Sequence, residues 1–219
     1  MSERGTRLVI FGRQGAGKGT QSKRLAAHFG VPHISTGDIF RAAIAAGTEI
    51  GLAAKAIMDR GDLVPDDVLR GIVAERLDQP DVAGGWLLDG FPRTPTQADD
   101  LDEIADPPLD LAINLEVPED VVVERISSRR VCEAEGHIYT ATDPSAVAGE
   151  CEVDHSPVTQ REDDTEAAVR QRLAVYAEQT EPLLARYRQR NQLVLVDGVG
   201  DVGDVAQRVI AAVTDELGR

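Results

Sequence analysis

The sequence predicts an α/β fold in which five parallel strands form one doubly wound sheet flanked by helices. Short apolar runs rich in β-forming residues alternate along the chain with helical patterns, which is typical of such folds. The first run, residues 8–11, and the last, residues 193–196, are almost continuously apolar. Strands of this kind are buried on both faces, as in a parallel sheet, whose ligands bind at the carboxyl ends of the strands.

The individual elements follow in order along the chain. Strands are expected at residues 8–11, 33–35, 86–88, 111–115 and 193–196, and helices at 18–29, 65–77 and 118–130. Pro118 suits the start of the last of these helices, and Glu119 and Asp120 suit its first turn.

Two segments interrupt this alternation. Residues 36–64 insert helical material between the second and third strands, and residues 131–160 contain Gly, Pro, Cys and acidic residues without a long helical period. An interruption as long as the second is typical of a functional lid or a small subdomain. We therefore expect a core domain (1–35, 65–127 and 166–219), an insert (36–64) and a lid (128–165).

The composition excludes several classes of partner. The 219 residues include 23 Lys+Arg and 38 Asp+Glu, a formal net charge of −15, and only 4% are aromatic. This argues against nucleic acids and anionic membranes as partners.

No signal peptide and no bilayer-spanning run is recognisable. Two cysteines are too few for a disulfide scaffold, so we expect a cytoplasmic protein, and a monomer, since no interface stripe is evident.

A glycine-rich segment follows the first strand. Residues 12–20 (GRQGAGKGT) match the G-x-x-x-x-G-K core of the P-loop, in which backbone N–H groups and a helix N-terminus bind phosphates. Lys18 would reach the β- and γ-phosphates, and the Thr20 hydroxyl would suit Mg²⁺. The alternative is a glycine-rich turn with an incidental lysine. The ATP-contacting loop residues are then Gly15, Ala16, Gly17, Lys18, Gly19 and Thr20.

Two further strands end in polar residues. Residues 33–41 (HISTGDIFR) and 86–93 (WLLDGFPR) each place hydroxyls or a carboxylate, a glycine and an arginine after a strand. Asp89 could hold Mg²⁺ through water, as acidic residues after strands do in P-loop enzymes. Alternatively, Asp89 only caps a helix.

These motifs together resemble the adenylate kinase family in its long-lid form. The chain contains, in order, GAGKGTQ (15–21), STGD (35–38), GDLVP (61–65), DGFPRT (89–94), REDD (161–164) and VDG (196–198). The resemblance implies a P-loop NTPase fold and reversible phosphoryl transfer from Mg-ATP to AMP, giving two ADP, in adenine nucleotide homeostasis. It also implies that residues 36–64 bind the monophosphate. The family commonly has Pro where this chain has Gln14.

The resemblance also assigns roles to single residues. The residues implied at the AMP site are Thr36, Arg41, Asp62, Leu63, Val64, Gly90, Phe91, Pro92, Arg93, Gln97, Arg161 and Arg172. Those implied at the ATP site, besides the loop, are Arg125, Arg129, Ile138, Tyr139 and Gly200. The cations implied in catalysis are Lys18, Arg93, Arg129, Arg161 and Arg172.

The sequence offers no convincing general base, and this reaction needs none. A phosphate monoester has its second pKa near 6, so the AMP oxygen is largely anionic at neutral pH. Catalysis then consists of positioning and charge stabilisation. An arginine is otherwise most often a solvated or ion-paired surface residue, and Arg170 competes with Arg172 on the same expected helix.

The expected lid contains both cysteines of the chain. Cys132, Glu135, Cys151 and Asp154 form two x₂-spaced pairs, a candidate tetrahedral zinc set. Carboxylates weaken a site for a soft metal, so the same residues could instead form a polar network, or the cysteines could be free thiols. His137 and His155 could substitute as ligands.

Three other functions compete with the kinase hypothesis. One keeps the chemistry but uses another donor or acceptor, such as GTP or a different monophosphate. A nucleotide-binding switch would leave the arginine set and residues 89–93 unexplained. The third is a zinc-dependent interaction module built on residues 131–160.

Overall fold

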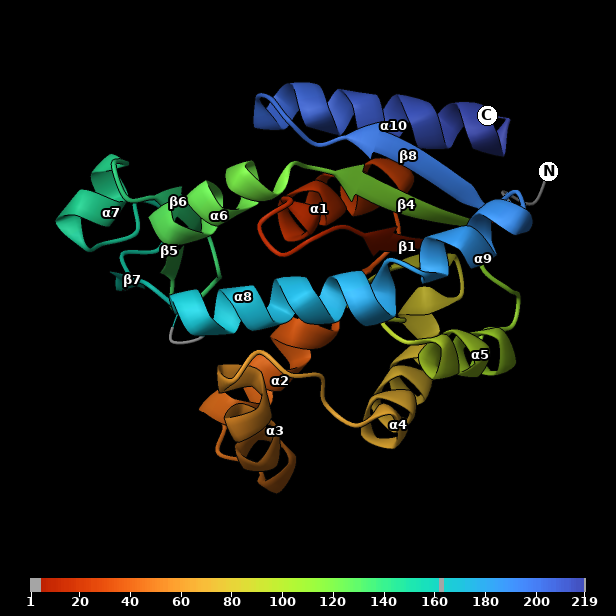
Figure 1. The fold of residues 1–219 in the computed structure, drawn as a ribbon, viewed down its shortest axis with the longest axis horizontal. Coiled ribbons are helices and arrows are strands. Elements are labelled where there is room, and N and C mark those ends of the chain that lie inside the picture. Colours follow the sequence, from red (N-terminus) through yellow and green to blue (C-terminus); the bar gives the residue numbers. More distant parts are fainter. Residues whose placement is uncertain (1–4, 162–163, 219) are drawn as a thin grey trace.

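The computed structural model describes residues 5–161 and 164–218 and contains the expected five-stranded parallel sheet (Figure 1). Its strands are β1 (Thr6–Phe11), β2 (His33–Ser35), β3 (Gly85–Asp89), β4 (Leu111–Glu116) and β8 (Leu193–Asp197), in the order β2-β3-β1-β4-β8. All neighbouring pairs are parallel. The five predicted strands are confirmed, and the structure only extends some of their ends.

Helices bury both faces of this sheet. On one face Leu8 and Ile10 of β1 belong to a core with α1 (Lys18–Phe29) and α10 (Val202–Leu217). On the other face Val9 and Phe11 belong to a core with α4 (Asp66–Leu77), α5 (Pro95–Ile104) and α9 (Leu183–Gln189). Burying a side chain of this size stabilises the fold by about 1.5–3 kcal/mol. Two-sided burial is therefore the reason for the continuous apolarity of the strand.

The insert between β2 and β3 is helical, as predicted. It contains α2 (Thr36–Ala45) and α3 (Glu49–Asp59), which lie below the sheet in Figure 1. The Ser35 and Thr48 side chains cap these helices by accepting bonds from the N–H groups of Asp38 and Gly51. After the insert come α4 and a short 3₁₀ turn, Pro80–Val82.

A second, smaller sheet lies at one end of the molecule (Figure 1). Strands β5 (Arg129–Cys132), β6 (Ile138–Thr140) and β7 (Val158–Thr159) pair antiparallel in the order β6-β5-β7, and α7 (Pro144–Ala148) packs beside them. Residues 131–160 therefore contain no long helix, as predicted.

The predicted helix at 118–130 is wrong at both ends. The helix α6 spans Glu119–Ser128, and Pro118 is its N-cap rather than its first helical residue. Arg129 and Arg130 instead pair with Thr140 and Tyr139 of β6. Pairing with a distant strand thus overrides the local helical pattern. The predicted helix at 65–77 likewise begins one residue later, because Pro65 is the N-cap of α4.

A long helical segment follows the small sheet. It consists of α8 (Glu166–Val175), a π-helical turn (Tyr176–Thr180) and α9, and Figure 1 shows it crossing in front of the main sheet. Among the described residues, no helix has the length and apolarity that crossing a membrane requires.

Candidate active site

The glycine-rich loop joins β1 to α1 at the carboxyl edge of the sheet. Gly12, Gly15 and Gly17 have φ angles of 144°, 81° and 96°, which residues with a side chain rarely adopt. Lys18, the first residue of α1, donates from Nζ to the Gly12 and Arg13 carbonyls at 2.7 and 3.1 Å. The loop therefore curls around the lysine directly in front of a helix N-terminus, as a phosphate-binding loop does.

Lys18 lies in a cluster of charges from several elements. Burial lowers the pKa of Lys18 from its ordinary 10.5 to about 8. The Asp89 carboxylate opposes this shift, whereas three nearby guanidinium groups lower the pKa of Lys18 further. These guanidinium groups belong to Arg93, Arg129 and Arg172. The structure therefore brings four of the five predicted catalytic cations into one electrostatic cluster.

Asp89 ends β3 beside the loop, where a Cβ on Gly19 would lie 3.8 Å from Asp89 Oδ2. Burial raises the pKa of this carboxyl, but the His33 imidazole, 3.8 Å away, and the Lys18 ammonium outweigh burial and hold the pKa below its ordinary value. A charged carboxylate thus faces the start of α1, where Thr20 adds a hydroxyl. Oxygen groups of this kind fit Mg²⁺.

The predicted acceptor residues Thr36, Gly90 and Arg93 meet at the end of β3. Thr36 Oγ1 donates to the Gly90 carbonyl at 3.1 Å, and Arg93 Nε donates to the same carbonyl at 2.9 Å. Gly90 has a φ of 91°, and a Cβ there would lie 2.5 Å from Thr36 Oγ1. Only glycine therefore fits between them. Arg41 forms an ion pair with Asp38 one turn into α2.

Gln97 lies fully buried in the first turn of α5. Its Oε1 accepts from the Arg93 N–H at 2.7 Å, and its Nε2 donates to Asp66 Oδ1 at 2.6 Å. Thr94, not Asp89, caps α5, so the alternative in which Asp89 only caps this helix is wrong. The hydrogen bond between Gln97 and Asp66 was not predicted from the sequence.

The remaining predicted AMP residues lie at different depths. Leu63 and Val64 line a cavity of about 450 Å³, and so does Asp62. Phe91 and Pro92 are buried, and Phe91, with no exposed surface, is a member of the hydrophobic core. Their side chains therefore support the acceptor site from beneath.

The predicted ATP residues outside the loop divide into two groups. Arg125 donates to the Ala16 and Gly198 carbonyls at 3.4 and 3.2 Å, so it ties the glycine-rich loop to the loop after β8, where Gly200 has a φ of 123°. In the small sheet, Ile138 is 48% exposed, whereas Tyr139 packs its ring among buried lid residues.

Arg129 is held by a carboxylate to which the sequence analysis gave no role. Arg129 Nε donates to Asp164 Oδ2 at 2.8 Å, and Nη2 contacts Oδ1 of the same group. The Asp164 side chain has no exposed surface, and Gln14 Nε2 donates to it at 3.3 Å. In the sequence, the signal for this carboxylate was the motif at 161–164, whose last residue is Asp164. Gln14 therefore connects the glycine-rich loop to the start of the small sheet through Asp164.

Two further predicted arginines face the insert. Arg172 Nη2 donates to the Met58 carbonyl at the end of α3 at 3.0 Å. Arg161 is close enough to Asp38 to lower the pKa of that carboxyl, a shift that burial opposes and Arg41 favours more strongly. The neighbouring Glu162 and Asp163 of the motif lie outside the described residues.

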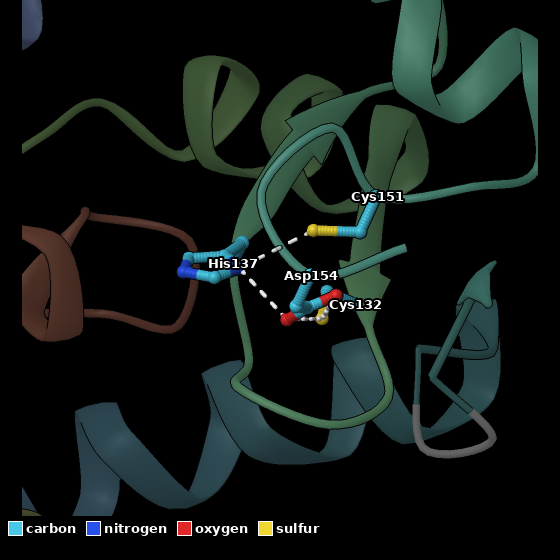
Figure 2. A group of neighbouring side chains, drawn as sticks. All are labelled: Cys132, His137, Cys151 and Asp154. Atoms are coloured by element: carbon cyan, nitrogen blue, oxygen red, sulfur yellow. Dashed lines mark hydrogen bonds and ion pairs between the residues drawn. The ribbon is translucent and has the colours of Figure 1, made fainter. Parts of the chain in front are cut away.

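A compact group of side chains occupies the small sheet (Figure 2). Cys132, His137, Cys151 and Asp154 each offer one ligand atom, and these atoms all lie within 4.8 Å of one another. Individual separations are 3.1 Å from Cys132 Sγ to Asp154 Oδ2, 3.3 Å from Cys151 Sγ to His137 Nδ1, and 3.4 Å from His137 Nδ1 to Asp154 Oδ2.

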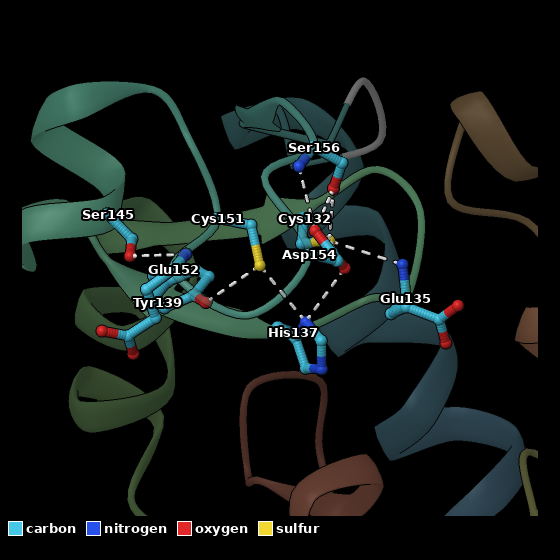
Figure 3. A network of polar contacts seen from close by, with 9 residues as sticks. All are labelled: Cys132, Glu135, His137, Tyr139, Ser145, Cys151, Glu152, Asp154 and Ser156. Atoms are coloured by element: carbon cyan, nitrogen blue, oxygen red, sulfur yellow. Dashed lines mark hydrogen bonds and ion pairs between the residues drawn. The ribbon is translucent and has the colours of Figure 1, made fainter.

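The structure replaces one member of the predicted metal set. Glu135 lies on the exposed surface with its carboxylate directed away from the group (Figure 3), and only its backbone N–H contacts Cys132 Sγ, at 3.4 Å. His137 takes the fourth position. His155 bonds to Glu150 at 2.8 Å and is 78% exposed, so it is not part of the group.

Hydrogen bonds surround this group. Burial raises the pKa of the Cys132 thiol, but its contacts with Ser156 Oγ and the Glu135 N–H outweigh burial and bring it down to about 7. The Ser156 hydroxyl and N–H both donate to Asp154 and hold the pKa of that carboxyl well below its usual range. On the other side, Tyr139 Oη lies 3.2 Å from Cys151 Sγ (Figure 3).

Comparison with known proteins agrees with this geometry. A model of the family described as adenylate kinase matches residues 10–192. An adenylate kinase of Methanosarcina mazei is 47% identical over 93% of this chain and 96% of its own length. Those of Thermodesulfovibrio yellowstonii and Streptomyces avermitilis are 48% and 46% identical, over 94% and 96% of this chain and 97% and 98% of their own lengths. The chain therefore belongs to the adenylate kinase family.

Proposed function

We propose that this protein catalyses the reversible transfer of the γ-phosphoryl group of Mg-ATP to AMP, giving two ADP. The cluster of Lys18 with Arg93, Arg129 and Arg172 at the carboxyl edge of the sheet carries this proposal. Two polyanions must approach each other there, and a dense group of cations offsets their repulsion. The same cations favour phosphoryl transfer over other uses of a P-loop.

The ATP side consists of the loop, Arg125 and Arg129. Inward N–H groups of residues 15–20 would bind the β- and γ-phosphates, and Lys18 would exchange its bonds to the loop carbonyls for bonds to phosphate oxygens. The exposed face of Ile138 would contact the adenine. When bound, Mg²⁺ would neutralise phosphate charge, with Thr20 and, through water, Asp89 holding it.

The acceptor side consists of residues from β2, β3 and the insert. Arg41, Arg93, Arg161 and Arg172 would bind the AMP phosphate, while Thr36, Leu63, Val64 and Gln97 would enclose its base. An AMP oxygen, already anionic at neutral pH, attacks the γ-phosphorus. The bond from that phosphorus to the bridging oxygen breaks, and ADP leaves with the electron pair. No side chain has to remove a proton.

The two insertions would act as covers. Residues 36–64 would close over the monophosphate and residues 128–165 over ATP, with residues 1–35, 65–127 and 166–219 as the core. Arg172 contacts the end of α3, and Gln14 reaches Asp164 beside the small sheet, so both covers already contact the core. Closure would exclude water, which otherwise competes as acceptor.

We also propose that the protein is a monomer that serves adenine nucleotide homeostasis in the cytoplasm. Its two unpaired cysteines are in keeping with that reducing compartment.

A single assay tests the proposed activity. The protein is incubated with Mg-ATP and each of AMP, GMP, CMP and UMP, and nucleoside diphosphates are followed by chromatography. ADP formation that requires AMP supports the proposal. Conversion of another monophosphate in preference to AMP would reassign the acceptor, and conversion of none would favour a nucleotide-binding switch.

We expect kcat/KM for Mg-ATP to fall as the pH rises through about 8. The pKa of Lys18 in the ligand-free protein is about 8, so above that pH the free enzyme loses the charge that attracts the triphosphate. The folded pKa lies below the unfolded 10.5, so this group's contribution to the free energy of unfolding increases between pH 8 and 10.5. Steady-state rates between pH 7 and 10 measure the effect.

The bound state provides the control for this pH dependence. Phosphate charges raise the pKa of Lys18, so kcat at saturating Mg-ATP should keep its value to a higher pH than kcat/KM does. Identical pH profiles for kcat and kcat/KM would contradict the assignment.

We further propose that the lid group holds a structural zinc ion. Tetrahedral zinc with sulfur at about 2.3 Å and nitrogen or oxygen at about 2.0–2.2 Å needs ligand atoms about 3.3–3.8 Å apart. The four atoms of Cys132, His137, Cys151 and Asp154, within 4.8 Å of one another, fit this with small adjustments. Cys132, with a pKa of about 7, readily supplies a thiolate.

Matched variants separate this set from the spacing-based one. Protein purified without chelator should contain about one zinc per chain, and His137→Gln should lose it while Glu135→Gln keeps it. Zinc removal should lower the midpoint of thermal unfolding by about 5–10 °C, the size expected for a few kcal/mol of lost binding energy. Elemental analysis and calorimetry measure both; zinc far below one equivalent in the unmodified protein would favour the polar network.

A further inference from the structure

We infer that Arg208 positions the loop after β8 as a binding surface for the base of the donor nucleotide. This loop comprises residues 197–200 and joins β8 to α10. The inference rests on the proposed function, because it concerns the ATP that this site accepts. The loop would touch the base, whereas Arg208 acts through the loop and is therefore a positioning residue.

The topology of the sheet decides on which side of the glycine-rich loop the base can lie. In the strand order β2-β3-β1-β4-β8 the chain leaves β1 towards β2 and later leaves β4 towards β8, so the crevice opens between β1 and β4. The phosphates would bind in the loop after β1, and the segments after β2 and β3 carry the proposed acceptor residues Thr36 and Arg93. The rest of the donor therefore extends over the ends of β4 and β8.

The loop after β8 packs directly against the glycine-rich loop. A Cβ on Gly198 would lie 3.6 Å from the Ala16 carbonyl oxygen and 2.6 Å from a methyl group of Val117, so a larger residue would not fit. Arg125 donates to the carbonyls of both Ala16 and Gly198 and so connects the two loops. The loop after β8 therefore borders the phosphate site on the side where the base is expected.

Arg208, in the second turn of α10, holds the residues on either side of Gly198. Its Nη1 donates to the Asp197 carbonyl, and its Nη2 donates to the Val199 carbonyl. Nη1 also lies 3.1 Å from Asp197 Oδ2, while Asp197 Oδ1 accepts from the Val199 N–H at 2.9 Å. Arg125 thus fixes the middle of the loop, and Arg208 fixes its two flanks.

The bond to Val199 also fixes the peptide group that leads to Gly200. In a trans peptide the C=O and the following N–H point in opposite directions, so the Gly200 N–H is turned away from Arg208. A Cβ on Gly200 would lie 3.0 Å from Arg208 Nη2, and its φ is 123°, so a glycine is needed here. Val199 is 39% exposed. An oriented N–H beside an apolar side chain is typical of sites for small ligands.

A purely structural role would explain little of this arrangement. The side chains of Arg208 and Asp197 are 37% and 67% exposed, and ion pairs as exposed as this contribute little to the free energy of unfolding. What the contacts of Arg208 supply is order. A loop that is already held in one conformation loses less entropy when a ligand binds to it.

The test compares two ligands by calorimetry: ATP, and inorganic tripolyphosphate, which has the phosphate chain but no base. Both are titrated with Mg²⁺ present. In Arg208→Met the Kd for ATP should rise about fivefold, because the loop must then be ordered on binding, and the Kd for tripolyphosphate should not change. Arg208→Lys keeps the charge but not the forked contact, so it should still lose part of the ATP affinity. Arg188→Met removes the same charge from an exposed position of α9 and should change neither Kd.

Steady-state kinetics provide a second readout of the same variants. Arg208→Met should raise the KM for Mg-ATP while kcat and the KM for AMP keep their values, because only binding of the donor base depends on the loop. Thermal melts of both Arg208 variants should show nearly unchanged midpoints. If Arg208→Met is unfolded at the assay temperature, Arg208→Lys decides the outcome.

Two results would overturn the inference. Equal losses of affinity for ATP and tripolyphosphate would mean that Arg208 acts only through its charge, and unchanged affinities for both would make its contacts structural only. If the unmodified protein does not convert AMP, the proposed function fails first. Normal conversion of AMP, with unchanged ATP affinity in the Arg208 variants, refutes only the role of Arg208.

Discussion

Replacing Lys18 by alanine is expected to lower kcat at least about 10³-fold, the range seen when one charge-stabilising donor is removed from a phosphoryl- or acyl-transfer site. The lysine is the only ammonium group in a cluster that otherwise consists of guanidinium groups and Asp89. It also bonds to the Gly12 and Arg13 carbonyls. Its loss would remove charge from the transition state and leave the loop without its central donor.

The kinetics should separate this effect from misfolding. Burial lowers the pKa of Lys18, so the charge is unfavourable in the ligand-free protein, and its removal should leave the protein folded by circular dichroism. Lys23→Ala removes a charge from an exposed position of the same helix and should have normal kinetics. Turnover in Lys18→Ala within tenfold of the unmodified protein would remove Lys18 from its catalytic role.

The parallel sheet was predictable from sequence because burial on both faces leaves a strong local signal. Residues 8–11 are continuously apolar since each one contacts a helix on one face or the other. The small sheet leaves no such signal. Arg129 reads as the end of a helix, and only pairing with Thr140, formed after the chain turns back, makes it a strand residue.

The metal set shows the same limit at the level of side chains. Spacing predicted Glu135, but in the turn Gly136 N–H bonds to the Cys132 carbonyl at 3.1 Å, and Cys132 N–H bonds to the His137 carbonyl at 2.9 Å. This hairpin places His137 opposite Cys132 and directs the Glu135 side chain to solvent. The spacing of the residues alone does not show which side chains the backbone hydrogen bonds of a turn bring together.

Contacts between distant segments were also beyond sequence reasoning. Gln14 and Asp164 are separated by 150 positions, and the motif at 161–164 did not indicate which carboxylate would hold Arg129. In the glycine-rich loop, by contrast, the N–H groups that bind phosphate belong to consecutive residues of one short segment. The phosphate loop could therefore be assigned from sequence, and the carboxylates Asp66 and Asp164 that orient functional side chains could not.

Replacing Arg93 by alanine is expected to lower kcat/KM for AMP about 10³-fold with little change in stability. The guanidinium lies between the two halves of the site: its Nε bonds to the Gly90 carbonyl at 2.9 Å, and its charge lowers the pKa of Lys18. A group in this position can contact the acceptor phosphate and the transferring group together, and a bidentate arginine contact is among the strongest that phosphate makes.

The stability of this variant distinguishes a functional arginine from a structural one. Burial lowers the pKa of Arg93, and Arg172 and Arg41 lower it further, with only Asp89 opposing, so the folded protein disfavours this charge when no ligand is bound. Removing it should leave the midpoint of thermal unfolding unchanged or raised, as is common where function requires unfavourable charge.

Arg188→Ala, exposed on α9, should change neither rate nor midpoint. Arg93→Lys should recover only part of the rate, because a lysine keeps the charge but not the bidentate contact. Full recovery in Arg93→Lys would show that charge alone is required. A lowered midpoint of thermal unfolding in Arg93→Ala, with a modest loss of rate, would make Arg93 a structural residue.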